Sequence, residues 1–109
     1  MTSLVEQHLD AIRALCREYG VNRLDLFGSA ATGAFREEDS DVDFVAAFAD
    51  TRAPGYADRY FGLAEALEAL LGRDVDLVTD RSIRNPNFRR AVDVARQPLY
   101  ERRDQETAA

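Results

Sequence analysis

Residues 41–48, DVDFVAAF, constrain the fold of this chain more than any other segment. Their aromatic and aliphatic side chains are typical of a β-strand, in which successive side chains point to opposite faces of a sheet. Asp41 and Asp43 would then lie on one face, about 6.6 Å apart along the strand. The residues on the opposite, core face would be Val42, Phe44 and Ala46. Because neighbouring carboxylates repel each other, the segment predicts a strand whose polar face meets a cation or solvent.

The rest of the chain predicts an α+β fold, a small mixed β-sheet packed with about four helices. Apolar residues recur at helical spacing in some segments, and others have the apolar runs of extended structure. The predicted helices lie in 4–19, 60–71 and 85–96, and the extended segments in 22–28, 73–79 and 98–101. We find no internal repeat and no linker, so we expect one sheet with one set of helices.

The last predicted helix has a clear beginning. The side chain of Asn85 can accept hydrogen bonds from the first free N–H groups, and Pro86 suits the first helical position. The inner face of this helix would be formed by Phe88, Ala91, Val92 and Ala95. We therefore expect the helix to bury a strip of four apolar residues.

Length and charge limit the classes of function. The 109 residues fit one domain, predicted over 1–101, with 102–109 as a flexible tail. No apolar run approaches the roughly 20 residues that span a bilayer, and the N-terminus lacks the pattern of a signal peptide. One cysteine, Cys16, cannot form an internal disulfide, so we expect a cytoplasmic location. A net charge of −6 disfavours direct nucleic-acid binding.

A third carboxylate, Asp76, lies inside the apolar run VDLVT. If its strand is adjacent to residues 41–48, then Asp41, Asp43 and Asp76 would converge. Three carboxylates can hold two metal ions about 3.5–4 Å apart, and Mg²⁺ accepts such oxygen ligands together with phosphate and water. Two other interpretations stay open: Asp41 and Asp43 could face solvent, and Asp76 could be an ordinary charge on an edge strand.

A glycine–serine turn precedes the carboxylates in the sequence FGSAATG. Gly28 permits a sharp turn or a close approach of the backbone to a ligand. Ser29 could contact a phosphate group through its hydroxyl and its amide, particularly if a helical turn begins there. It could equally be a simple helix cap. The turn therefore predicts a phosphate-binding loop beside a metal site.

In their order, the motifs GSAATG, SDVDFV and VDLVT resemble those of the DNA polymerase beta-like nucleotidyltransferase superfamily. The chain is most similar to the minimal nucleotidyltransferase (MNT) antitoxins that are paired with HEPN toxins, over roughly residues 4–101. The resemblance implies the nucleotidyltransferase core fold. It also implies that Gly28 and Ser29 contact the nucleoside triphosphate. Asp41, Asp43 and Asp76 would be the metal-binding and catalytic residues.

The same resemblance implies a reaction. Two Mg²⁺ ions and ATP would be the cofactor and donor, and AMP would pass to a tyrosine hydroxyl of a HEPN-type toxin partner, which is thereby neutralised. Two alternatives remain at this point. The protein could neutralise its partner by binding alone, or it could modify a small molecule such as an antibiotic. The small size of the chain argues against a second substrate domain and hence against the last alternative.

Overall fold

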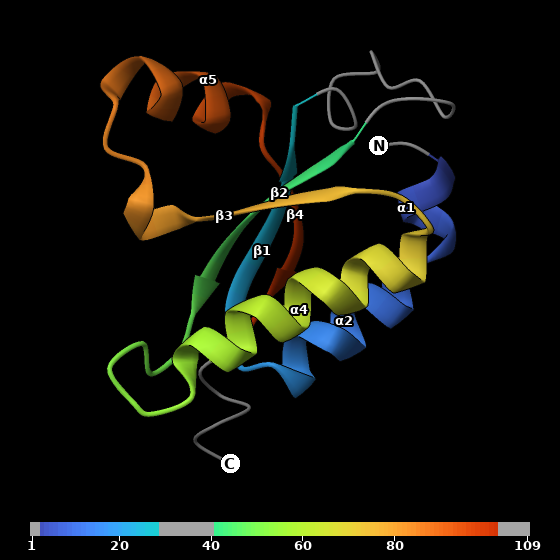
Figure 1. Ribbon diagram of the computed structural model, residues 1–109. Helices are drawn as coiled ribbons and strands as arrows, with labels where there is room; N and C mark the ends of the chain where they lie inside the picture. The colour runs from blue at the N-terminus through green and yellow to red at the C-terminus, as the bar shows by residue number, and fades with distance from the viewer. Residues whose placement is uncertain (1–2, 29–40, 103–109) are drawn as a thin grey trace.

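The computed structural model describes residues 3–28 and 41–102. Its elements follow one another in a simple order (Figure 1). They are α1 (Ser3–Gln7), α2 (Leu9–Glu18), β1 (Val21–Phe27), β2 (Val42–Phe48), α4 (Tyr56–Leu71), β3 (Val75–Thr79), the 3-10 helix η1 (Asp80–Ser82), α5 (Pro86–Ala95) and β4 (Gln97–Glu101). Within these two ranges, none of the helices combines the length and hydrophobicity that a membrane crossing needs.

The four described strands form one mixed sheet in the order β3-β2-β1-β4. Strand β1 pairs antiparallel with β2 and with β4, whereas β3 pairs parallel with β2 through the crossover helix α4. The predicted α+β class with a small mixed sheet is thereby confirmed. The predicted extended end, residues 98–101, is part of β4, and the N–H of Arg102 still donates to the carbonyl of Asn22 at 2.8 Å. Residues 103–109 of the predicted tail lie outside the described part.

The main core lies between one face of the sheet and helices α1, α2 and α4. Figure 1 shows α2 and α4 side by side across this face, with α5 on the other side of the sheet. Strand alternation sends Val42, Phe44 and Ala46 into this core, as the pattern of residues 41–48 predicts. The opposite face carries a smaller cluster, made of Phe27, Val45, Ile83 and Val92. The candidate site residues therefore belong to the less covered face.

The N-terminal helix differs from the prediction in one detail. Residues 4–19 were expected to form a single helix, but α1 and α2 are separated at His8. The His8 ring Nδ1 lies 2.8 Å from the carbonyl of Leu4, and the His8 N–H donates to Val5 at 3.1 Å in a tighter turn. These local bonds replace regular helical ones at this position.

Helix α5 begins as predicted but packs differently. The Asn85 side chain accepts from the N–H groups of Asn87 and Phe88. The expected strip of four buried residues is wrong, because only Val92 is buried, while Ala91 is exposed and Phe88 is 41% exposed. Phe88 instead sets its ring edge-on to Phe27 at 6.1 Å. Helix α5 is therefore attached to the sheet by a small apolar cluster around Val92 and by ion pairs.

The centre of this attachment is Asp25, a fully buried carboxylate on β1. Arg96, the residue after α5, donates from Nε to Asp25 at 2.6 Å, and Nε of Arg23 lies 3.0 Å from the same oxygen. Arg96 also contacts Asp93 and Asp80, and Asp80 in turn accepts from Arg89 at 2.9 Å. A buried carboxylate is tolerated only with such partners. The network therefore ties β1, η1 and the C-terminal end of α5 together.

We predict that Arg96→Ala lowers the free energy of unfolding by about 2–3 kcal/mol, since among residues 3–28 and 41–102 it leaves the buried Asp25 with Arg23 alone as ion-pair partner. The matched control is Arg90→Ala, an exposed arginine of the same helix, with an expected change of about 0.5 kcal/mol or less. Urea unfolding of both variants measures the difference. Equal stabilities of the two variants would contradict the assigned role of Arg96.

Candidate functional site

Two of the predicted carboxylates lie opposite each other on neighbouring strands. Strands β2 and β3 pair so that Asp43 and Asp76 are direct partners in the parallel register. Side chains of paired residues share a face, so both carboxylates point away from the main core. Asp43 is half-buried and Asp76 is exposed. The structure thus brings these two residues together, although they are 33 positions apart in the sequence.

Asp41, the third predicted carboxylate, precedes β2 and is exposed. It lies two residues before Asp43, and its charge contributes to the electrostatic potential at the Asp43 carboxyl group. Asp74, which precedes β3, is also exposed, as expected for a residue that solvent can satisfy. The acidic residues therefore gather where β2 and β3 begin.

The clustering of acidic residues changes the pKa of Asp43. Burial, followed by the charges of Asp76 and Asp41, raises the pKa of Asp43 from 3.8 to about 6. Each of these influences disfavours the charged carboxylate. A bound cation would reverse their effect, because it attracts all three carboxylates at once. The raised pKa is thus the property expected of a cation-binding carboxylate in the absence of its cation.

Gly28 lies directly against this carboxylate. Phe27 is the register partner of Asp43 in the antiparallel pair β1–β2, and Gly28 follows with φ +70°. A Cβ atom at Gly28 would collide with Oδ2 of Asp43. Glycine adopts this left-handed backbone without strain and leaves room for the Asp43 carboxylate, which any larger residue would have to displace. Gly28 therefore lies on the same side of the sheet as the acidic residues. Ser29, the other predicted nucleotide-binding residue, lies outside the described residues.

The carboxylate oxygens of this site are suitable ligands for a hard divalent cation, but they do not surround a single metal position. Carboxylate oxygens from Asp41, Asp43 and Asp76 are the ligands that Mg²⁺ prefers. Among residues 3–28 and 41–102, however, no three acidic, histidine or cysteine side chains are arranged so that they could hold a metal ion as they stand. Asp43 and Asp76 share one face of the sheet, and Asp41 lies just before β2, but the three carboxylates do not close on a common point. β3 ends the described strand order, so Asp76 lies on an edge strand, and its role as a metal ligand stays a prediction.

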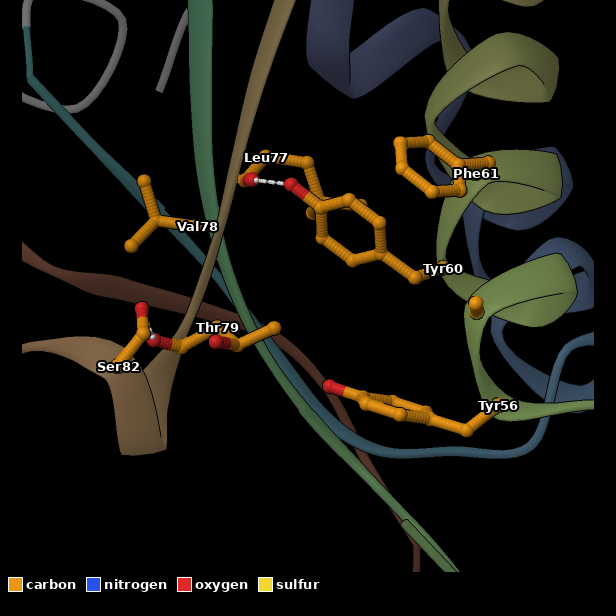
Figure 2. Close-up of a pocket in the computed structure, with 8 residues that line it drawn as sticks. Tyr56, Tyr60, Phe61, Leu77, Val78, Thr79 and Ser82 are labelled. Carbon is orange, nitrogen blue, oxygen red and sulfur yellow. Dashed lines mark hydrogen bonds between the residues drawn. The ribbon is translucent and has the colours of Figure 1, made fainter. Parts of the chain in front are cut away.

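A groove borders β3 on the side away from β2, and we call it the α4–β3 groove. It has a volume of about 450 Å³. Figure 2 shows side chains from α4 facing those of β3 and η1 across it. Its lining consists of Tyr56, Ala57, Tyr60, Phe61, Leu77, Val78, Thr79 and Ser82. The helical spacing of residues 60–71 alone would place Tyr60 in the core, and only the structure shows that Tyr56, Tyr60 and Phe61 line a groove.

Tyr60 connects the groove to the acidic face. Its hydroxyl donates to the carbonyl of Leu77, the residue after Asp76, at 2.5 Å. Burial and then the charge of Asp76 raise the pKa of Tyr60, so the two groups are close enough to interact. Sequence reasoning missed this link, because a tyrosine at helical spacing is typical of core packing. The sequence feature that could have indicated this link is the tyrosine hydroxyl at the end of the otherwise aliphatic face of residues 60–71.

Comparison with known proteins agrees with this geometry. A family model of the nucleotidyltransferase domain matches residues 10–100. One relative is MJ1379 of Methanocaldococcus jannaschii, which is named as a candidate protein adenylyltransferase. The two chains are 40% identical over 76 residues, and the aligned part covers 70% of this chain and 74% of MJ1379. A second relative is the protein adenylyltransferase MntA of Thermococcus cleftensis, which is 39% identical to this chain over 82 residues. The aligned part covers 74% of this chain and 79% of MntA.

Solved structures give the same picture. A candidate minimal nucleotidyltransferase superposes with a TM-score of 0.74 at 36% identity, over 90% of this chain and 97% of that chain. A toxin–antitoxin complex with AMP-PNP has a TM-score of 0.66 at 27% identity, over 92% and 78% of the two chains. A complex of a tri-AMPylated Shewanella oneidensis HEPN toxin with its MNT antitoxin has a TM-score of 0.63 at 24% identity, over 94% and 77%. This last likeness shows the fold alone.

Proposed function

The chain belongs to the nucleotidyltransferase domain family, and we propose that it is a protein adenylyltransferase that acts as an antitoxin. It would transfer AMP from ATP to a tyrosine hydroxyl of a HEPN-type toxin partner and so neutralise the toxin. The observation that carries the proposal is the pairing of Asp43 with Asp76 beside Gly28. This arrangement places acidic ligands and a close-approach glycine on one side of one sheet.

The relatives support the choice of substrate class. Two of the sequence relatives are named as protein adenylyltransferases, one of them as a candidate. Among the similar structures, one toxin–antitoxin complex contains AMP-PNP, and one antitoxin accompanies a tri-AMPylated HEPN toxin. These properties belong to those proteins, and we extend them to this chain as a proposal. A cytoplasmic location fits the proposal, because a chain with the single cysteine Cys16 cannot form an internal disulfide.

Asp41, Asp43 and Asp76 are the residues that would hold Mg²⁺. When bound, the metal would neutralise the triphosphate and stabilise the negative charge that develops at the reacting phosphorus. Gly28 would let the backbone approach the phosphates closely, and Ser29 would supply donors to them. The acidic face alone would repel ATP, so this chain would bind the nucleotide together with the cation.

The proposed reaction forms one bond to phosphorus, breaks another, and moves one proton to a carboxylate of this chain. The tyrosine oxygen of the acceptor forms a bond to the α-phosphorus, and the bond from that phosphorus to the bridging oxygen breaks, releasing diphosphate. The hydroxyl proton passes to the carboxylate of Asp76, which we propose as the base. Asp43 and Asp41 would hold the cation that positions the α-phosphate for in-line attack, in which attacking and leaving oxygens lie on opposite sides of phosphorus.

Mass spectrometry of the partner tests the proposal. The purified protein, the HEPN-type partner, ATP and Mg²⁺ are incubated together, and the intact partner is then weighed. We expect one or more added AMP units that map to tyrosine, and none when the metal is removed by a chelator. An unmodified partner, under conditions in which the two proteins form a complex, would reject the transferase proposal. Neutralisation without modification would then favour action by binding alone.

A further inference from the structure

The strand order decides from which side an acceptor can reach the proposed site. In-line transfer places the attacking hydroxyl and the leaving diphosphate on opposite sides of the α-phosphorus. Gly28, the residue proposed to contact the triphosphate, follows β1, whereas Asp76 lies on β3, with β2 and Asp43 between them. If the diphosphate lies towards β1, then the acceptor approaches from the β3 side. The α4–β3 groove borders the sheet on that side.

The groove is suited to an aromatic side chain. Its volume of about 450 Å³ is within the usual range of ligand pockets, and three aromatic rings form much of its wall. Phe61 is 61% exposed, which is unusual for a large apolar residue, and its ring meets Tyr60 edge-on at 5.1 Å. The hydroxyl groups of Thr79 and Ser82 border the same space (Figure 2). Offset and edge-on ring contacts would stabilise another aromatic ring here.

The groove is not suited to an added β-strand. Three polar backbone groups of β3 and its end already have side-chain partners. The N–H of Val75 donates to Glu68 at 3.3 Å, and the carbonyl of Leu77 accepts from Tyr60. The hydroxyl of Ser82 donates to the carbonyl of Thr79 at 2.8 Å. A pairing strand would have to break these bonds, so the groove favours an inserted side chain over strand addition.

The charges around the groove select among aromatic ligands. Asp76 precedes Leu77, Asp58 follows Ala57, and both carboxylates are exposed. Arg81 precedes Ser82 at the end of the groove away from Asp76. Near Asp76 and Asp58 the two carboxylates disfavour a phosphate group and favour a neutral ring that is carried by a positively charged segment. The triphosphate would therefore stay on the Gly28 side, where the metal compensates its charge.

We propose that the α4–β3 groove binds the acceptor tyrosine, carried on a basic segment of the partner protein, and that Phe61 determines this specificity. The inference rests on the proposed function, whose acceptor site it identifies. A tyrosine ring packed against Phe61 and Tyr60 would bring its hydroxyl towards the carboxylate of Asp76, the residue before Leu77 on β3. Phe61 contributes apolar contact area and takes no part in the chemical step.

A binding experiment tests the groove independently of catalysis. The probe is the peptide acetyl-Arg-Gly-Tyr-Gly-Arg-amide, titrated into the isotope-labelled protein and followed by NMR chemical shifts. We expect shifts concentrated in residues 56–61 and 77–82, and much weaker ones with a peptide in which aspartate replaces both arginines. Shifts confined to other surfaces, or none at millimolar peptide, would overturn the inference.

Kinetics with the whole partner protein give the second test. We expect Phe61→Ala to raise KM for the partner about tenfold while kcat and the KM for ATP change little. The matched control is Val94→Ala, which truncates another exposed apolar residue, 84% exposed on α5, and should leave all constants unchanged. Phe61→Tyr, which keeps the ring, should restore the KM.

The outcomes separate the two proposals. If the wild-type protein modifies the partner but Phe61→Ala has an unchanged KM, the groove proposal fails and the proposed function stands. If the wild-type protein does not modify the partner, the proposed function fails, and the peptide titration still decides whether the groove binds a tyrosine ring. Since Phe61 is mostly exposed, the alanine variant should fold, and its melting temperature checks this.

Discussion

Replacing Asp43 by asparagine is expected to abolish nucleotide transfer and, at the same time, to raise the melting temperature. The substitution preserves the shape of the side chain and removes its charge. Loss of a metal-binding carboxylate should reduce kcat by about a thousandfold or more, since metal stabilisation of the transition state is worth several kcal/mol. The gain in stability follows from the electrostatics of the metal-free site.

The sign of the stability effect comes from the raised pKa. Burial and the charges of Asp76 and Asp41 raise the pKa of Asp43 to about 6 in the folded protein, above the 3.8 of an ordinary aspartate. The folded state therefore binds a proton more tightly than the unfolded chain does. The stabilising contribution of protonated Asp43 is complete below about pH 4 and is lost as the pH rises through about 6. At pH 8 the wild-type protein thus carries the full cost of this carboxylate.

We expect Asp43→Asn to be more stable than wild type by about 1 kcal/mol at pH 8, after allowing for solvent screening of a half-exposed group. This corresponds to a rise of about 4–8 °C in Tm for a domain of this size. At pH 5 the difference between the two proteins should be smaller. Scanning calorimetry at both pH values, without metal, measures it. A variant that is less stable than wild type at pH 8 would contradict the assigned electrostatics.

Ligand addition should reverse the order of stability. Mg²⁺ with ATP stabilises a folded state that binds them, by mass action. We expect the wild-type Tm to rise on adding both, and the Tm of Asp43→Asn to stay the same. The metal proposal therefore has a readout that does not depend on catalysis or on the partner.

Replacing Gly28 by alanine is expected to have the second largest effect. The new Cβ would collide with Oδ2 of Asp43, and the residue would keep a left-handed backbone with φ near +70°. The strain should cost about 1–2 kcal/mol of stability. The flexible carboxylate can relieve the collision by moving away, so transfer should fall about a hundredfold through misplacement of Asp43.

Gly72→Ala is the matched control for this variant. Gly72 has nearly the same backbone angle, φ +69°, but a Cβ there would meet nothing within 4 Å. It should therefore show a similar loss of stability, about 1–2 kcal/mol, with unchanged transfer. Combined measurement of Tm and kcat separates backbone strain from the displacement of Asp43. Equal transfer rates in Gly28→Ala and Gly72→Ala would mean that the close approach to Asp43 has no role in the reaction.

Much of the local structure could be predicted because it depends on short-range patterns. The alternation in residues 41–48 determined which side chains enter the core, and strand β2 confirms it through Val42, Phe44 and Ala46. The N-cap at Asn85 and the stripe of α4 have the same local origin. These features depend on residues within a few positions of one another, so propensity and periodicity are sufficient.

Other features depended on contacts that no local pattern contains. Helix α5 was expected to bury four apolar residues, but its position is decided by the bond of Arg96 to Asp25, 71 positions away. The strip was wrong because α5 packs through Val92 and Phe88 alone, and ion pairs whose partners are distant in sequence supply further contacts. The α4–β3 groove was likewise invisible, since its walls come from separate elements.

The sequence by itself determined the acidic face of β2, the glycine turn and the apolar core, because each follows from side-chain type and spacing. Only the tertiary structure decided that Asp43 is opposite Asp76, that Gly28 lies against Asp43, and that an aromatic groove opens beside them. The physical reason is that strand pairing and helix packing are set by the whole chain's burial and hydrogen bonding. The residue pattern of a strand predicts on which face of the sheet a carboxylate lies. Which side chains it contacts depends on the neighbouring strand.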